Sequence, residues 1–84
     1  MLRLRTTELN SDKLCSVLYK GETWYLASDL FASLGITNEV EAFKKIPPQS
    51  WKVVVVYDDI SKDVMPVKIV SPAGILSLLT KNGE

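Results

Sequence analysis

Four consecutive valines, Val53 to Val56, place the strongest constraint on how this 84-residue chain can fold. Their β-branched side chains restrict χ1 and disfavour a helix, so the run predicts a β-strand from Trp51 to Tyr57. Because these apolar residues do not alternate with polar ones, we expect the strand to be central in a sheet and buried on both faces. The rest of the chain must then supply its neighbours.

Two further strand regions precede the valine run. The alternating Leu-Arg-Leu-Arg of residues 2–5 predicts a short N-terminal strand with Arg3 and Arg5 facing water. Strand-forming residues then surround Lys20-Gly21, so segments 14–19 and 23–26 predict a β-hairpin.

A second hairpin is expected after the valines, with residues 64–70 as its returning strand. Pro66 has no N–H to donate, so this strand should start late or lie at a sheet edge. The connection holds Asp58, Asp59 and Asp63 but lacks the glycine and closing glutamate of a calcium loop. We therefore interpret it as a solvated hairpin tip and expect no metal site.

Helical periodicity appears between the two predicted hairpins. Ser28 is a candidate N-cap, and a helix that begins at Asp29 should end at Gly35. A second helix is expected from Asn38, with a cap of its own, to about Lys45.

Pro47-Pro48 should stop the second helix, because proline lacks an amide donor and disfavours the α region in the residue before it. Ser71 before Pro72 predicts the N-cap of a last helix that ends near Gly83. The predicted fold is α+β, a single domain over residues 1–84 with two β-hairpins, a pair of short helices between them and a C-terminal helix.

The composition argues against catalysis. The chain has no histidine, so its serines lack that general base and histidine cannot ligate a metal. Cys15, the single cysteine, suits a small core position in a reducing compartment, and the four glycines form no phosphate-binding loop. We expect a non-enzymatic cytoplasmic protein with no cofactor, no signal peptide and no membrane span.

Net charge is zero, so any basic surface must be local. The most basic segment contains Lys44, Lys45 and Lys52 around the proline turn and Trp51. These lysines could neutralise phosphates while Trp51 stacks on an unpaired base. The alternative is structural, since lysines complement helix C-termini and a tryptophan that opens a strand usually packs in the core.

Two segments resemble the BRO N-terminal domain of phage antirepressors and of large DNA viruses. Residues 20–35 read KGETWYLASDLFASLG, with the glycine turn, aromatic pair, helix-start aspartate and Leu-Gly of that family. Residues 69–79 read IVSPAGILSLL, which looks like its second motif, a strand followed by a glycine-containing helix. The resemblance implies a DNA-binding or gene-regulatory module, either the N-terminal part of a longer protein or a shortened phage protein, in the host cytoplasm.

The leading hypothesis is DNA binding, largely through phosphate contacts. The expected contacts are Arg3, Arg5, Lys44, Lys45, Lys52 and Lys81. A second hypothesis is direct binding of a repressor or host protein, for which acidic residues supply a surface, namely Glu22, Asp29, Glu39 and Glu41. A third is a homo-oligomer in which an uncovered strand edge pairs with a second copy. The residues that match the family motif have structural explanations instead: Trp24, Asp29, Leu34, Gly35 and Gly74.

Overall fold

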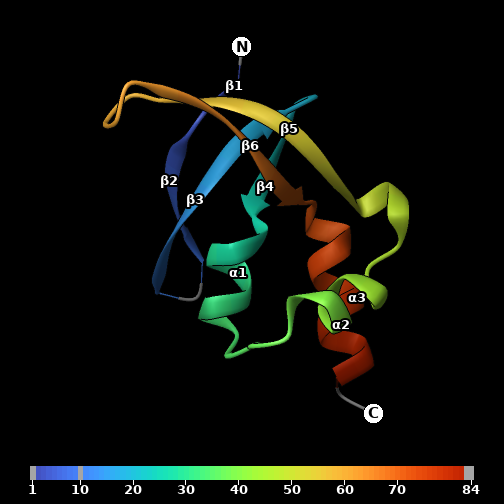
Figure 1. Ribbon diagram of the computed structural model, residues 1–84. Helices are drawn as coiled ribbons and strands as arrows, with labels where there is room; N and C mark the ends of the chain where they lie inside the picture. The colour runs from blue at the N-terminus through green and yellow to red at the C-terminus, as the bar shows by residue number, and fades with distance from the viewer. Residues whose placement is uncertain (1, 10, 83–84) are drawn as a thin grey trace.

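The protein folds as a curled β-sheet with helices against one face (Figure 1). The computed structural model describes the backbone of residues 2–9 and 11–82 and the side chains through Leu79. Within these residues the elements are β1 (Leu2–Arg3), β2 (Arg5–Leu9), β3 (Asp12–Tyr19), β4 (Glu22–Leu26), α1 (Ala27–Ser33), α2 (Glu39–Lys44), the 3-10 helix η1 (Pro48–Ser50), β5 (Trp51–Asp58), β6 (Asp63–Val70) and α3 (Pro72–Asn82). The predicted α+β class, with helices between two hairpins and at the C-terminus, is confirmed.

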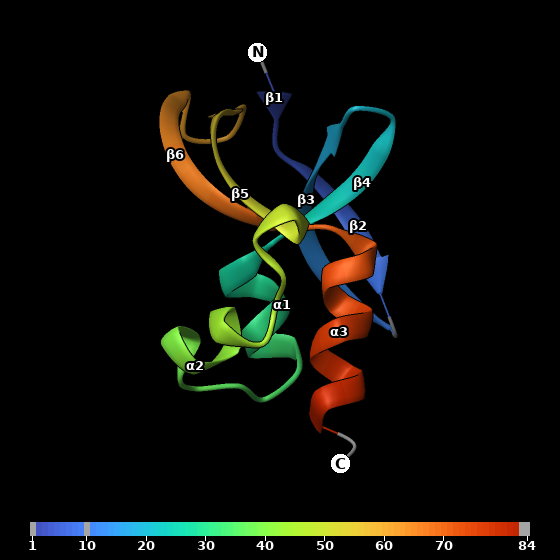
Figure 2. The same cartoon turned by 90° about the vertical axis from the view of Figure 1, so that its right-hand side faces the viewer.

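The N-terminal segment joins the two ends of the sheet. The strand order is β1-β5-β6-β4-β3-β2, in which β1 runs parallel to β5 and every other pair is antiparallel. Leu2 pairs with Val56, whereas Arg5 pairs with Ser16 on the opposite edge. The Leu4 N–H donates to the Tyr57 carbonyl at 3.1 Å, between these two pairings. The β3–β4 and β5–β6 hairpins therefore splay on either side of β1 (Figure 2).

Each face of the sheet has its own apolar core. The inner core, enclosed by the curl, combines five buried side chains: Val17, Trp24, Leu26, Val56 and Ile69. Leu2 and Leu4 pack against it while Arg3 and Arg5 are exposed, which confirms the predicted alternation. The outer core lies between the other face and the helices, and its buried members are Leu14, Ala27, Leu30, Phe31, Ala42, Ile46, Val70 and Leu78.

The first predicted hairpin is correct, and the structure adds a strand to it. Lys20 and Gly21 have φ values of 50° and 83°, the two positive values of a type I′ turn. β2 pairs with β3 along its whole length, so this unit is a three-stranded meander. The polar residues of Thr6 to Glu8 gave no apolar alternation, which is why the sequence did not reveal β2.

The expectation that the valine run is buried on both faces is wrong. Val53 and Val55 are 59% and 50% exposed, while Val56 is fully buried in the inner core. These two valines are exposed because the helices cover only part of the sheet, and the β5–β6 hairpin extends past them (Figure 1). The strand thus alternates between a buried face and an open one, as period-two geometry requires.

The prediction for Pro66 is correct in part: β6 does not start late, but Pro66 lies on a stretch of it that is an unpaired edge. β6 begins at Asp63, lies between β5 and β4, and pairs Pro66 with Val55. β4 reaches β6 only at Ile69 and Val70, so Pro66 has a strand neighbour on one side alone. A proline is tolerated there because its missing donor interrupts no β4–β6 ladder.

The helix ends follow local sequence signals, with one exception. Asn38 caps α2 by accepting the Glu41 N–H at 3.2 Å, as predicted. Gly35, with φ of 74°, ends α1 while the Ile36 N–H donates to the Phe31 carbonyl at 2.8 Å. Ser28, however, is not an N-cap, because α1 begins at Ala27 after Leu26 and has no side-chain cap.

The proline signals and the last N-cap are correct. α2 ends at Lys44, before Pro47-Pro48, and Ser71 accepts the Gly74 N–H at 3.2 Å to begin α3. α3 continues through Asn82, and Gly83 lies outside the described residues.

Gly74 allows α3 to approach η1 closely. A Cβ at this position would lie 2.7 Å from Val70 Cγ1 and 3.0 Å from the Ser50 carbonyl oxygen. The Ser71 N–H also donates to that carbonyl, at 2.9 Å, so the oxygen cannot easily move. The predicted role of Gly74 in close packing is confirmed.

Gly74→Ala should therefore destabilise the protein. Alanine normally stabilises a helix interior by about 1 kcal/mol relative to glycine, but overpacking at a fixed backbone costs about 1–3 kcal/mol. We expect a lower free energy of unfolding in urea, with exposed Ala73→Ser as the control. A more stable Gly74→Ala variant would show that α3 shifts freely away from η1.

Candidate binding surfaces

The two predicted N-terminal cations lie near acidic groups. Arg3 forms a 2.9 Å ion pair with Asp59, and its guanidinium lies 5.3 Å from the centroid of the Tyr57 ring. Both side chains are well exposed, so the pair contributes roughly 0.2–1 kcal/mol. Arg5 lines a hollow of about 140 Å³ together with Asp58 and Asp59. Both arginines therefore lie on a surface of mixed charge and not on a purely basic one.

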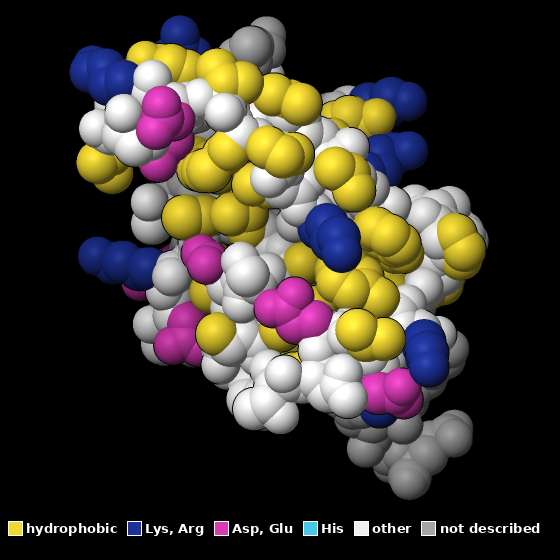
Figure 3. Space-filling model, in the orientation of Figure 1, with side chains coloured by type: hydrophobic (Ala, Val, Ile, Leu, Met, Phe, Trp, Pro, Cys, Tyr) yellow, Lys and Arg dark blue, Asp and Glu magenta, His cyan; other side chains and the backbone are white. Residues whose placement is uncertain are grey.

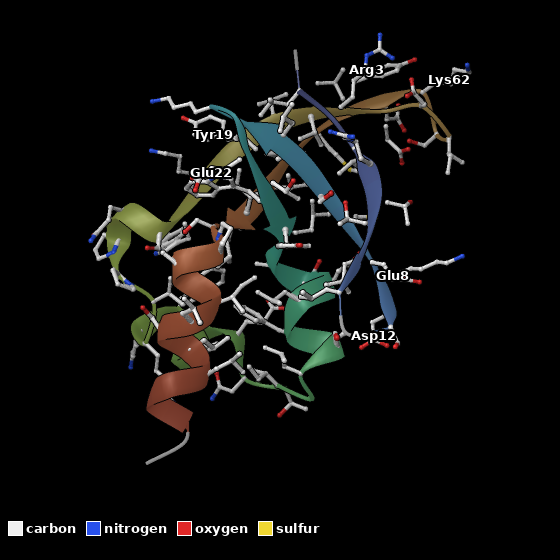
Figure 4. All side chains as sticks on the ribbon, turned by 180° about the vertical axis from the view of Figure 1, so that it is seen from behind. Arg3, Glu8, Asp12, Tyr19, Glu22 and Lys62 are labelled. Atoms are coloured by element: carbon white, nitrogen blue, oxygen red, sulfur yellow. The ribbon has the colours of Figure 1, made fainter. Side chains whose placement is uncertain are left out.

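The predicted lysines lie on other elements. Lys44 forms a 3.1 Å ion pair with Glu41 one turn earlier on α2, and Lys45 is the C-cap of that helix. Lys52 lies on β5, with its ammonium 5.9 Å from the Tyr19 ring centroid. Lys81 is on α3, but its side chain lies outside the described part of the chain. Figure 4 shows Arg3 near the Lys62 hairpin tip, whereas Tyr19 lies across the sheet, so the fold does not join Arg3 and Lys52.

Trp51 is partly buried and packs against the outer core, as the structural interpretation of this residue expected. Its ring centroid lies 4.8 Å from that of Phe43, which in turn meets Phe31 edge-on at 5.1 Å. The Lys68 ammonium lies above this row, 5.0 Å from the Phe43 centroid and 5.9 Å from that of Trp51. The exposed side of the Trp51 region therefore carries a cation that was not among the predicted contacts.

The acidic residues of the second hypothesis also separate. Glu22 pairs with Tyr19 in the strand register, and Figure 4 shows these two residues at the same end of the sheet. Glu39 and Glu41 lie on α2, and Glu41 bonds Lys44. Asp29 accepts the backbone N–H of Cys15 at 2.9 Å, so it connects α1 to β3. These four carboxylates do not form one acidic surface.

An exposed apolar surface lies on the β5–β6 hairpin, and no predicted site contained it. Val53, Val55 and Tyr57 point to one face of β5, and their register partners on β6 are Lys68, Pro66 and Val64. We call these six residues the hairpin face. Val64 is 54% exposed and Pro66 is also exposed, so four apolar side chains lie open side by side when Val53 and Val55 are included. Hydrophobic side chains accordingly gather over this hairpin in Figure 3.

A hollow adjoins the hairpin face under β6. Its volume is about 290 Å³, and Pro66, Val67 and Lys68 form its β6 wall. Leu26, the first two residues of α1 and Glu39 of α2 complete its lining. The apolar surface therefore adjoins a recess whose lining includes both a lysine and a glutamate.

A small basic group surrounds Tyr19 at the other end of the sheet. Lys20 and Lys52 place their ammonium groups 5.5 and 5.9 Å from the Tyr19 ring centroid. Tyr19 also meets the buried Trp24 ring edge-on at 5.3 Å. We call Tyr19, Lys20 and Lys52 the Tyr19 cluster. Lys20 was missed in the sequence because its role in the turn gave no sign that β5 would bring a second lysine to the same ring.

Cys15 shows no sign of an activated thiol. Burial, followed by a hydrogen bond and negative charge from Asp29, raises the pKa of the Cys15 thiol, and Asp58 adds to the effect. A raised pKa lowers the thiolate fraction at neutral pH, and the thiolate is the nucleophile. No group of three or more potential metal ligands occurs in residues 2–9 and 11–82.

Asp29→Asn should make Cys15 react faster with Ellman's reagent. The change removes a negative charge that raises the thiol pKa, so the thiolate fraction at pH 8 increases, while the asparagine carbonyl can still accept the Cys15 N–H. The pH–rate profile should move to lower pH, and Asp12→Asn, which removes a carboxylate that bonds Ser33 instead, should leave it unchanged. An unmoved Asp29→Asn profile would show that the Asp29 charge does not contribute to the raised thiol pKa.

Within the described residues, no helix has the length and apolar character needed to cross a membrane. Comparison with protein-family models, curated proteins and solved structures found no match to this chain. The BRO resemblance of residues 20–35 and 69–79 therefore stays a prediction.

Proposed function

We propose that this chain is a non-catalytic gene-regulatory module of the phage antirepressor type that binds a repressor or host protein through the hairpin face. The observation that carries the proposal is the exposure of neighbouring apolar side chains on that face, led by Val53 at 59%, Val64 at 54% and Val55 at 50%. Single exposed apolar residues are common, but a contiguous group is typical of a protein-binding surface. The proposed location is the cytoplasm of the host cell.

The charge distribution favours protein binding over broad phosphate binding. Net charge is zero, and both Arg3 and Lys44 already have carboxylate partners. Phosphate-driven affinity grows with the number of cations that can contact the backbone together. Cations that are separated and partly neutralised contribute little, whereas an apolar face with few charges resembles the core of a protein interface.

The antirepressor part of the proposal rests on the two BRO-like segments. Their central residues have structural roles in this fold: Trp24 is buried, Gly35 ends α1, and Gly74 allows close packing. The similarity therefore concerns the scaffold and supports a shared regulatory role without assigning contacts. The hairpin face lies between the two segments in sequence and supplies the contact surface.

Val55→Glu should reduce partner capture at least tenfold. A carboxylate in the middle of an apolar contact would have to lose its hydration without gaining a partner. Affinity chromatography of an extract of phage-infected cells on immobilised wild-type and variant protein, quantified by mass spectrometry, measures the loss.

Leu18→Glu is the matched control, because Leu18 is 51% exposed on β3 and is not part of the hairpin face. Both variants should keep their free energy of unfolding within about 1 kcal/mol, since both positions are exposed. Equal capture of the same proteins by wild type and Val55→Glu would refute the hairpin face as the site.

Nucleic-acid binding is the second candidate function, favoured by the Tyr19 cluster. Two lysines within 6 Å of one aromatic ring can contact adjacent phosphates. This arrangement retains Lys52 from the predicted set and replaces the α2 lysines with Lys20. This candidate function therefore proposes a single local DNA site, the Tyr19 cluster.

If this second function holds, the double variant Lys20→Gln/Lys52→Gln should lose about tenfold in DNA affinity by fluorescence anisotropy. Removal of two duplex phosphate contacts should also lower the slope of log K against log salt by about 1.8. The control is Lys44→Gln/Lys45→Gln, which alters the originally predicted pair and should change neither quantity. Absence of binding by the wild type even at 50 mM salt would eliminate the nucleic-acid candidate.

A further inference from the structure

We infer that the partner contacts the hairpin face with an amphipathic segment that carries a carboxylate directed at Lys68. The inference rests on the proposed function, since it names the chemistry of the partner at the same surface. Four features carry it: the protected edge of β6, the dimensions of the face, the position of Lys68 and the hollow beside it.

The first feature favours docking on the face over addition of a strand to the edge. β6 has no strand neighbour on its β4 side from Asp63 to Lys68. Pro66 pairs with Val55 in the β5–β6 ladder although it has no N–H to donate. This pairing loses no hydrogen bond only if the backbone N and C=O of Pro66 point away from β5, toward the open side. A strand added there would find no N–H at the centre of the edge. Proline at this position thus protects the edge.

The second feature is the size of the face. Val53 to Tyr57 span about 13 Å at roughly 3.3 Å per residue, and the face is two strands wide. That length matches about two and a half turns of an α-helix. A helix that lies along the hairpin would place apolar side chains at i, i+3 and i+4 over the valines.

The third feature is an ammonium group with no counterion. Lys68 is the one charged member of the hairpin face, and its ammonium lies over the Phe43 and Trp51 rings. No carboxylate among the described residues forms an ion pair with it. A partner that covers Lys68 with apolar atoms alone would bury an unpaired charge, which is unfavourable. A partner carboxylate removes that cost and fixes the orientation of the segment.

The fourth feature is the place where this carboxylate would lie. Lys68 and Glu39 both line the 290 Å³ hollow beside the face, and no ion pair joins them. A partner side chain that enters from the β6 side meets the ammonium next to Pro66. Because Glu39 lines the same hollow, its negative charge disfavours an anion inside it, so we expect the partner carboxylate to contact Lys68 from outside the hollow.

The test uses a displayed library of random 16-residue peptides selected on the immobilised full chain. Enriched peptides should combine an amphipathic apolar pattern with an aspartate or glutamate and should bind Val55→Glu at least tenfold more weakly. Lys68→Gln should weaken binding about tenfold, while Lys62→Gln, at the exposed tip of the same hairpin, should not. Replacing the peptide acid with its amide should weaken binding to wild type but have no further effect on Lys68→Gln.

The outcomes separate this inference from the proposed function. Peptides that depend on Val55 but lack an acid, or that ignore Lys68→Gln, overturn the inference and leave the hairpin face as a protein-binding site. Peptides unaffected by Val55→Glu overturn both. A library with no enrichment, or a Val55-dependent dimer of the free chain in sedimentation velocity, also overturns the inference, the latter because a second copy then occupies the face.

Discussion

The fold depends on one N-terminal segment that supplies a strand to each edge of the sheet. The N-terminal segment bonds to β5 through Leu2 and Arg3, continues past the Leu4–Tyr57 hydrogen bond, and then pairs with β3 from Arg5 onward. Because one segment serves both ends, the sheet must curl, and the curl encloses the inner core around Val17 and Val56. Burial of these apolar side chains stabilises the folded state. A short chain depends on such burial because it removes a smaller fraction of its surface from water than a larger domain does.

This curl also explains why the hairpin face is open. The inner side of β5 and β6 fills the curl, and the helices cover the other side only near Trp51 and Val70. Farther along the hairpin, no element of residues 2–9 and 11–82 covers the outer side, and Val53 and Val55 remain exposed. The same geometry leaves β6 beyond the reach of β4, and Pro66 occupies that unpaired stretch. The exposed face and the protected edge therefore have one common cause.

The arrangement of charges is better suited to discriminating between bound partners than to attracting charged partners from a distance. Cations on the N-terminal strand and on α2 have acidic neighbours, so the long-range field is weak. Three lysines are placed differently, because Lys20, Lys52 and Lys68 approach aromatic rings and form no ion pair with a described carboxylate. Such positions affect short-range recognition, where an ammonium next to apolar groups discriminates between partners that have a counterion and partners that lack one.

The sequence by itself determined the local features of this protein. Lys20-Gly21 fixed a turn, Asn38 and Ser71 fixed helix starts, and Gly35 fixed a helix end, because each depends on backbone conformation or on a bond within a few residues. Ser28 failed as a cap because α1 begins one residue earlier, at Ala27, directly after β4. β2 was missed because its pairing with β3, and not an apolar pattern, stabilises it.

Only the tertiary structure decided which face of the valine run is covered and which charges lie together. Val53 and Val56 are the same residue type in the same strand, yet one is 59% exposed and the other is fully buried. The difference comes from the curl and from the extent of the helices, which involve segments more than thirty positions apart, such as Leu2 and Val56. Lys68 likewise meets Phe43 through a contact that spacing along the chain could not reveal. Binding surfaces of this kind arise from long-range packing, whereas turns and caps arise from neighbouring residues.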